Sequence, residues 1–166
     1  MTSTVKPIPQ GFHTVTPSLT IRGAAEAIEY YKKALGAKEL MRMPGPGGRV
    51  MHAELQIGDS IIFVADEFPE YGTSRAPQTL GGSTGTLNLY VEDVDSAFNN
   101  AVNAGGKVNM PVADMFWGDR YGTFTDPYGH QWGIATHKED VAPQDMERRM
   151  KDFSAQMAQQ AQKKTA

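Results

Sequence analysis

The sequence contains no cysteine among its 166 residues. Disulfide bonds, thiolate nucleophiles and cysteine-based metal sites are therefore excluded, a composition that suits a reducing compartment. No stretch approaches the roughly 20 apolar residues that a membrane-spanning helix requires. The first eleven residues lack the apolar core of a signal peptide. We expect a cytoplasmic protein with no membrane partner.

The chain also lacks an excess of positive charge. It has 16 Lys and Arg against 19 Asp and Glu, a net charge of -3, and no run of basic residues. Nucleic acid is therefore not an expected partner. The glycine-rich segment 44–49 does not have the spacing of a phosphate-binding loop, so we interpret it as a turn or mobile loop.

What the sequence does contain is an internal repeat. Each half shows the same order of strand, helix and three further strands, and glycine ends each helix at Gly36 and Gly106. The predicted divisions are a flexible arm at 1–11, a first βαβββ module at 12–66, a linker loop at 67–83, a second module at 84–137 and a helical extension at 138–166. In the extension, an apolar stripe predicts packing on the module surface or on a partner subunit, and it comprises Met146, Met150, Phe153 and Met157.

One segment, 117–132, concentrates polar and aromatic residues around a turn. Asp126, Pro127 and Gly129 supply the chemistry of a β-turn, so the segment predicts a hairpin. His130, just after the turn, is interpreted as a surface or loop histidine. His137, at the end of the second module, is expected to be solvated.

Several segments together resemble one protein family. They are "RGAAEAIEYYKKALGA", "VMHAELQIGDS", "WGDRYG" and "DPYGHQW". The chain resembles the vicinal oxygen chelate superfamily of glyoxalase I, bleomycin-resistance proteins, fosfomycin-resistance enzymes and extradiol dioxygenases, most closely its PhnB-like branch. The resemblance covers roughly 13–137. It implies an α+β fold in which two modules pair curved mixed sheets around a cavity, here with a C-terminal helix added.

Metal-dependent members of that family hold a divalent cation with four side chains. The resemblance places these positions on Thr16, Thr86, Ile62 or Phe63, and Gly133. None of these residues is a strong ligand, because divalent cations require carboxylate, imidazole or thiolate donors. The usual metal site is therefore expected to be absent.

His52 and Glu54 lie on one predicted strand of the first module and are candidates for a different site. Two residues apart, they face the same way. They form either a hydrogen-bonded pair lining a polar cavity or two ligands of a rearranged divalent-metal site.

Strand alternation predicts which residues face the cavity. The candidate ligand-binding residues are polar or aromatic positions on three parts of the sheets: the first strand of each module, the middle strand of the first module and the rim before the hairpin. They are Thr16, Ser18, His52, Glu54, Thr86, Asn88, Tyr90, Trp117, Arg120 and Tyr121. Arg120 either pairs with Asp119 or Glu54 or holds an anionic ligand group. The alternative for the whole face is that it is solvated or covered by a partner chain.

Three functions follow from these observations. The first is a non-enzymatic small-molecule binding protein without the family metal. The second is a lyase, isomerase or dioxygenase with a rearranged or metal-free acid–base site, in which Glu54 is the base and His52 its partner. The third is a structural or regulatory homodimer assembled through the C-terminal helix.

Overall fold

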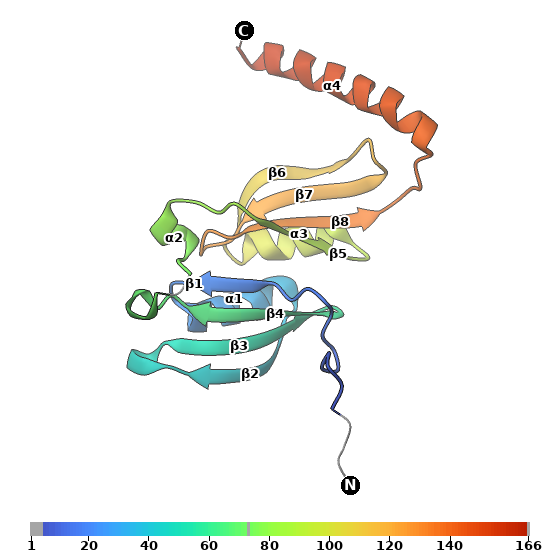
Figure 1. Ribbon diagram of the computed structural model, residues 1–166. Helices are drawn as coiled ribbons and strands as arrows, with labels where there is room; N and C mark the ends of the chain where they lie inside the picture. The colour runs from blue at the N-terminus through green and yellow to red at the C-terminus, as the bar shows by residue number, and fades with distance from the viewer. Residues whose placement is uncertain (1–4, 73, 166) are drawn as a thin grey trace.

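The computed structural model describes residues 5–72 and 74–165, with side chains through residue 159. The first module consists of β1 (Ser18–Ile21), α1 (Ala24–Leu35), β2 (Lys38–Pro44), β3 (Val50–Ile57) and β4 (Ser60–Asp66). The second consists of β5 (Thr86–Tyr90), α3 (Val94–Asn103), β6 (Lys107–Asp114), β7 (Asp119–Thr125) and β8 (Gln131–His137). The predicted repeat of strand, helix and three strands is confirmed (Figure 1).

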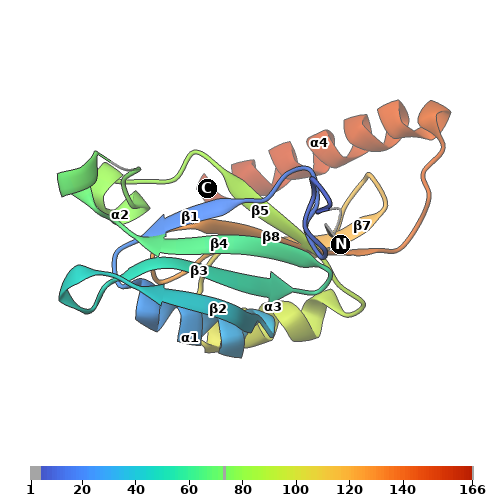
Figure 2. The ribbon, with the colours of Figure 1, turned by 60° about the horizontal axis from the view of Figure 1, so that its bottom comes forward.

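Each module forms a four-stranded mixed sheet, and the two sheets have equivalent strand orders, β1-β4-β3-β2 and β5-β8-β7-β6. The first strand of each module runs parallel to the last, and the remaining neighbours are antiparallel. Helices α1 and α3 lie beside each other on the same side of the sheets (Figure 2). The other side of each sheet, called here its open face, carries no helix of its own module. This is the α+β fold that the sequence predicts.

The two modules hold their helices by equivalent but chemically different contacts. In the first, the carboxylate of Asp66 accepts hydrogen bonds from the backbone N–H groups of Gly23 and Ala24 at the start of α1, at 2.9 and 3.0 Å. In the second, the hydroxyl of Thr136 accepts one from the N–H of Val94 at 2.9 Å. Both contacts satisfy N–H groups that the first turn of a helix leaves without partners.

The joint between the modules is built around Asp126, which is 4% exposed. Its Oδ2 accepts hydrogen bonds from the Tyr31 hydroxyl at 2.7 Å and from Trp132 Nε1 at 2.9 Å. Its Oδ1 accepts two more at 2.9 Å from the backbone N–H groups of Tyr128 and His130. Tyr31 belongs to α1, so this carboxylate ties the first module to the second within one chain.

His130 is not the surface histidine that its position after a turn suggests. It is 7% exposed, and its Nε2 lies 3.2 Å from the carbonyl oxygen of Thr20 in the other module. Burial lowers the pKa of His130 below its ordinary value, because the charged imidazolium is poorly solvated there.

One further expectation needs correction. The linker 67–83 is not a plain loop, because it contains two short helices, η2 (Pro69–Tyr71) and α2 (Pro77–Leu80). The side chain of Glu67 organises it by accepting hydrogen bonds from the N–H of Ala76 at 3.0 Å and the hydroxyl of Thr79 at 2.6 Å.

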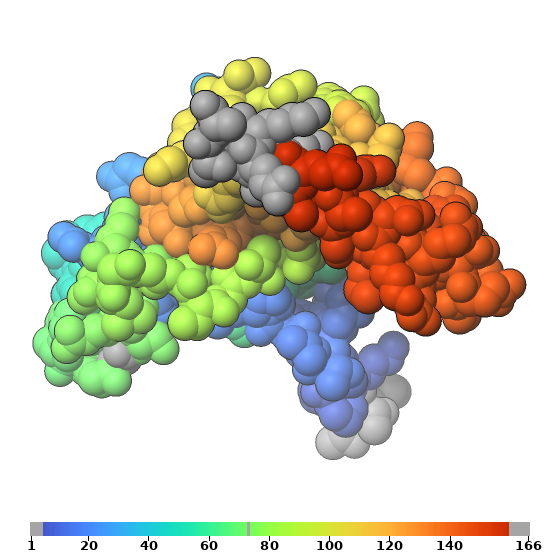
Figure 3. Space-filling model, turned by 90° about the horizontal axis from the view of Figure 1, so that it is seen from above, coloured from blue at the N-terminus to red at the C-terminus, as the bar shows by residue number. Residues whose placement is uncertain are grey.

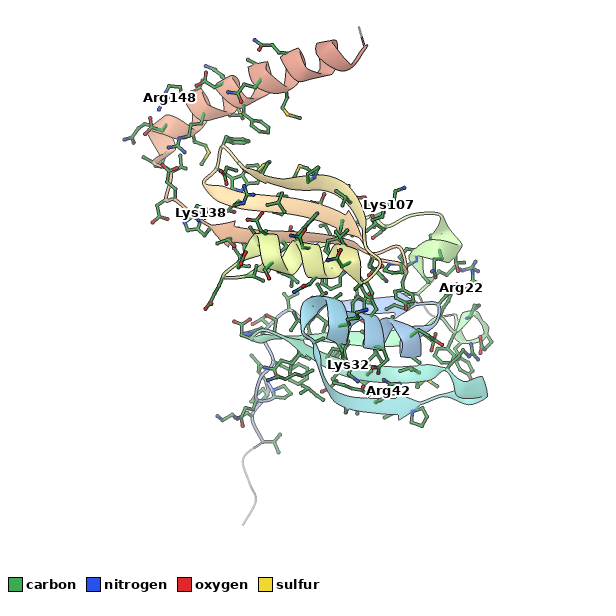
Figure 4. The ribbon with its side chains drawn as sticks, turned by 180° about the vertical axis from the view of Figure 1, so that it is seen from behind. Arg22, Lys32, Arg42, Lys107, Lys138 and Arg148 are labelled. Atoms are coloured by element: carbon green, nitrogen blue, oxygen red, sulfur yellow. The ribbon has the colours of Figure 1, made fainter. Side chains whose placement is uncertain are left out.

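The last element, α4 (Pro143–Thr165), lies over the second module and extends beyond it (Figures 1 and 3). Phe153 packs on Phe116 with ring centroids 5.5 Å apart, while Met150 and Met157 are 46% and 51% exposed. Arg148 points away from the module (Figure 4). Half of the predicted apolar stripe is thus left uncovered. Within the described part of the chain, no helix has the length and apolar character needed to cross a membrane.

Candidate functional site

The open face of the first sheet brings His52 and Glu54 together. His52 Nε2 lies 3.6 Å from Glu54 Oε1, and the imidazole ring packs against Phe63 at 4.8 Å between centroids. The distance exceeds that of a good hydrogen bond. The two side chains therefore form a loose polar pair beside an aromatic ring.

The open face of the second sheet carries a pocket of about 280 Å³. Its lining comes from β5, β7, β8 and the loop before β7, and comprises Asn88, Tyr90, Trp117, Asp119, Tyr121 and Ala135. Four of the predicted ligand-binding residues meet here: Asn88, Tyr90, Trp117 and Tyr121. Trp117 and Tyr121 meet edge to face at 5.8 Å between centroids.

Asp119 is the centre of this pocket, and the sequence interpretation did not select it. The carboxylate is 5% exposed. Its Oδ2 accepts hydrogen bonds from the Tyr90 hydroxyl and from Trp117 Nε1, both at 2.9 Å, and its Oδ1 lies 2.7 Å from His137 Nδ1. Burial acts to raise the pKa of Asp119, but the three hydrogen bonds outweigh it and hold this pKa below its ordinary value. Strand alternation could have found it, because Asp119 and Tyr121 are two residues apart on β7.

His137 completes the group at the end of β8. Nδ1 faces Asp119 and Nε2 lies 3.1 Å from Asp140 Oδ1. It is exposed, as the sequence predicts, but it is bound between two carboxylates rather than freely solvated. The hydrogen bonds to Asp119 and then to Asp140 raise the pKa of His137 above its ordinary value.

This arrangement predicts the titration of His137. Replacing exposed Asp140 with Asn should lower the pKa of His137 towards its ordinary value, because one of the two carboxylates that favour the imidazolium is removed. The imidazole resonances of His137, followed by NMR across pH 5 to 9, give the midpoint. Asp59→Asn, on the β3–β4 turn, is the matched control and should leave that midpoint unchanged. An equal midpoint in Asp140→Asn and the unmodified protein contradicts the assignment.

Arg120 lies outside the pocket, contrary to the predicted grouping. Its guanidinium makes two hydrogen bonds of 2.7 Å to Asp95 on α3 and one of 3.2 Å to Asp114. The expected partners Asp119 and Glu54 are therefore wrong. Adjacent residues on a strand point to opposite faces, so Tyr121 on the open face requires Arg120 on the helix side.

The remaining predicted residues do not line this pocket. Thr16 precedes β1, Ser18 begins it, and His52 and Glu54 lie on β3, so these four belong to the first module. Thr86 lies at the joint, where it lines a separate cavity of about 430 Å³ together with residues of both modules. A larger cavity of about 800 Å³ at the joint is lined by α1, the β3–β4 turn, β5 and α3.

The residues at the positions where the resemblance places the family's metal ligands supply no carboxylate, imidazole or thiolate group. The expected position of the glutamate ligand is Gly133, and beside it the Tyr121 hydroxyl donates a hydrogen bond of 2.9 Å to Asn88 Oδ1. A Cβ on Gly133 would overlap both of these oxygen atoms and come within 2.7 Å of Tyr121 Cε2. Among the described residues, no group of three or more His, Asp and Glu side chains is arranged to hold a metal ion.

The sequence profile of the Glyoxalase/Bleomycin resistance protein/Dioxygenase superfamily matches residues 11–134, three quarters of the chain. The chain belongs to this superfamily. The protein Rv0887c of Mycobacterium tuberculosis is 42% identical over 129 residues, which cover 76% of this chain and 76% of that protein. Protein YjdN of Escherichia coli is 27% identical over 146 residues, covering 75% of this chain and 96% of YjdN.

Solved structures of other proteins share the fold. TioX from Micromonospora sp. ML1 is 27% identical with a TM-score of 0.57, and the match covers 74% of this chain and 98% of TioX. A PhnB protein from Bacillus cereus has a TM-score of 0.58 at 18% identity, covering 75% of this chain and 99% of that protein, which supports the PhnB-like resemblance at the level of fold. The superfamily profile ends before α4, so this helix is an addition to the matched fold.

Proposed function

We propose that this superfamily member is a small-molecule binding protein whose ligand occupies the pocket on the second sheet and whose family metal site is lost. The observation that carries the proposal is Gly133. At the position of the glutamate ligand, the chain has no side chain, and the Tyr121–Asn88 hydrogen bond fills the space. These contacts support a site on the open face of the second sheet that binds a ligand without the family's metal ion.

The pocket also has the features of a recognition site. Ligand sites combine apolar or aromatic walls with a few oriented polar groups. Tyr90, Trp117 and Tyr121 supply ring surfaces, and Asn88 presents an amide at the floor. Because Asp119 fixes the hydroxyl of Tyr90 and the indole of Trp117, two of the three rings are positioned before a ligand arrives.

Ligand binding and metal content test the proposal together. A ligand that binds only the folded chain, present at 100 times its Kd, should raise the free energy of unfolding by about 2.7 kcal/mol. Thermal unfolding against a panel of small planar compounds should detect it, and Trp117→Ala should abolish the shift. The purified protein should contain no stoichiometric divalent metal by elemental analysis. One bound metal ion per chain, or no shift with any planar compound, would contradict the proposal.

An enzymatic role for the first sheet is the second candidate. The favouring observation is the His52–Glu54 pair at 3.6 Å, in which Glu54 would act as a base and His52 as its partner in a lyase, isomerase or dioxygenase reaction. The same pair, His52 and Glu54, is the candidate for a rearranged divalent-metal site. This alternative would be favoured if the unmodified protein turned over a substrate and Glu54→Gln abolished that turnover while ligand binding on the second sheet stayed unchanged.

We also propose that two chains form a homodimer through α4. The absence of cysteine is consistent with the proposed location in the cytoplasm. Met150 and Met157 are exposed on the same helix as Phe153, which docks on Phe116. An apolar stripe that leaves methionines exposed on both sides of its docked phenylalanine is suited to a partner subunit.

Charge placed on this stripe should weaken the dimer. The double variant Met150→Glu and Met157→Glu is expected to raise the dimer dissociation constant by at least tenfold, because two glutamates would be desolvated at the interface. Sedimentation equilibrium of the full chain measures this. Ala155→Glu and Gln159→Glu add the same charge at exposed positions on the opposite face of α4 and should change little. A monomeric unmodified protein, or equal dissociation constants in both double variants, contradicts the proposed interface.

A further inference from the structure

No basic side chain lines the second-sheet pocket. Its six lining residues include one acid, Asp119. The nearest arginine in sequence, Arg120, faces α3, where it is hydrogen-bonded to Asp95 and Asp114. The imidazole of His137 lies outside the lining, between the two carboxylates of Asp119 and Asp140, so any positive charge that it carries is balanced by two negative ones. An anionic ligand would therefore meet an ionised carboxylate without an uncommitted cationic partner.

The hydrogen bonds of the aromatic rings that line the pocket also favour a cationic ligand. The Tyr90 hydroxyl and the Trp117 indole N–H both donate to the ionised Asp119 carboxylate at 2.9 Å. A ring that donates a hydrogen bond to an anion gains electron density, because linked hydrogen bonds polarise one another. The face of an aromatic ring already attracts cations through its quadrupole, most strongly for tryptophan. Tyr121 adds a third ring at 5.8 Å from Trp117.

We propose that this pocket binds an organic cation, namely a quaternary or protonated amine that carries at most one aromatic ring. The inference rests on the proposed binding function and specifies its ligand class. The volume of about 280 Å³ sets the size limit. The three rings contact the alkyl groups of the cation, and the Asp119 carboxylate behind them balances its charge.

An isosteric pair of ligands separates charge from shape. Choline and 3,3-dimethylbutan-1-ol differ in one atom, a positively charged nitrogen against a neutral carbon. Benzyltrimethylammonium and phenylacetate provide a larger cation and an anion. Of the two tryptophans, Trp132 is fully buried and Trp117 lines the pocket, so intrinsic fluorescence reports on occupancy.

The cations are expected to bind at least tenfold more tightly than the neutral isostere, and phenylacetate more weakly than either cation. If the neutral or anionic compounds bind as tightly as the cations, the cation preference is overturned while the binding function stands. If none of the four compounds binds and the planar panel also gives no thermal shift, both proposals fail.

Variants locate the effect. Tyr90 is 69% exposed, so Tyr90→Leu should leave the fold intact while weakening benzyltrimethylammonium binding by roughly fivefold. Tyr90→Phe keeps the ring and should retain most of the affinity. Tyr71→Leu, 61% exposed on η2, removes a tyrosine of similar exposure from outside the pocket and is the matched control. Equal weakening by Tyr71→Leu and Tyr90→Leu, with the thermal stability of both unchanged, overturns the assignment to this pocket.

Discussion

Replacing Asp126 with alanine is expected to lower the free energy of unfolding by about 4 kcal/mol. Four donors converge on this buried carboxylate, and two of them, the Tyr31 hydroxyl and Trp132 Nε1, donate to no other acceptor among the described residues. A buried donor left without a partner costs about 1 to 3 kcal/mol. Urea denaturation followed by circular dichroism measures the change.

Two controls accompany this variant. Asp152→Ala removes an exposed carboxylate from α4 and should change the free energy of unfolding by less than about 0.5 kcal/mol. Tyr31→Phe removes a single donor and should cost about 1 kcal/mol. A loss below 1 kcal/mol in Asp126→Ala would show that the joint does not depend on this carboxylate.

Gly133→Ala is expected to lower the free energy of unfolding by about 2 kcal/mol, the usual cost of forcing an extra carbon into a packed site. The new methyl group would overlap Asn88 Oδ1 and the Tyr121 hydroxyl. In the background Asn88→Ala and Tyr121→Ala, which removes the overlapping atoms, the same substitution should cost less than about 0.5 kcal/mol. Chemical denaturation of the four proteins gives the coupling.

Gly85→Ala is the matched control for that cycle. A Cβ at Gly85 meets no atom within 4 Å, so this variant should be as stable as the unmodified protein or slightly more so. If Gly133→Ala is equally well tolerated, a side chain has room at position 133, and the steric argument against the family ligand fails.

The elements of the fold were predictable because they depend on local patterns. Gly36 takes a positive φ of 65° at the end of α1, as a helix-terminating glycine does. Alternation on β5 placed Asn88 and Tyr90 on one face. The start of β1 was less predictable: alternation extends back to His13, but regular pairing begins at Ser18, after Pro17, which has no N–H to donate.

Strand alternation places Asp119 on the same face as Tyr121, but the hydrogen bonds that give the missed residues their roles join distant parts of the chain. Asp119 meets Tyr90 from 29 residues away, and His130 is buried because Thr20 lies 110 residues away in the other module. Arg120 was misplaced for a local reason. Arg120 was placed on the rim before the hairpin, whereas β7 begins at Asp119 and the alternation of the strand already applies to Arg120. The register of the hairpin, which pairs Asp119 with His137, decides which residues can meet.

The residues at the ends of β4 and β8 that bind the start of a helix differ between the two halves of the chain. The first half uses a carboxylate, Asp66, to hold its helix, whereas the second half uses the hydroxyl of Thr136 and carries its buried carboxylates at Asp119 and Asp126. A protein assembled from two copies of the first half would lack both Asp119 of the pocket and Asp126 of the joint, and one assembled from two copies of the second half would lack Tyr31, which donates to Asp126. The duplicated halves have become complementary parts, and neither can replace the other.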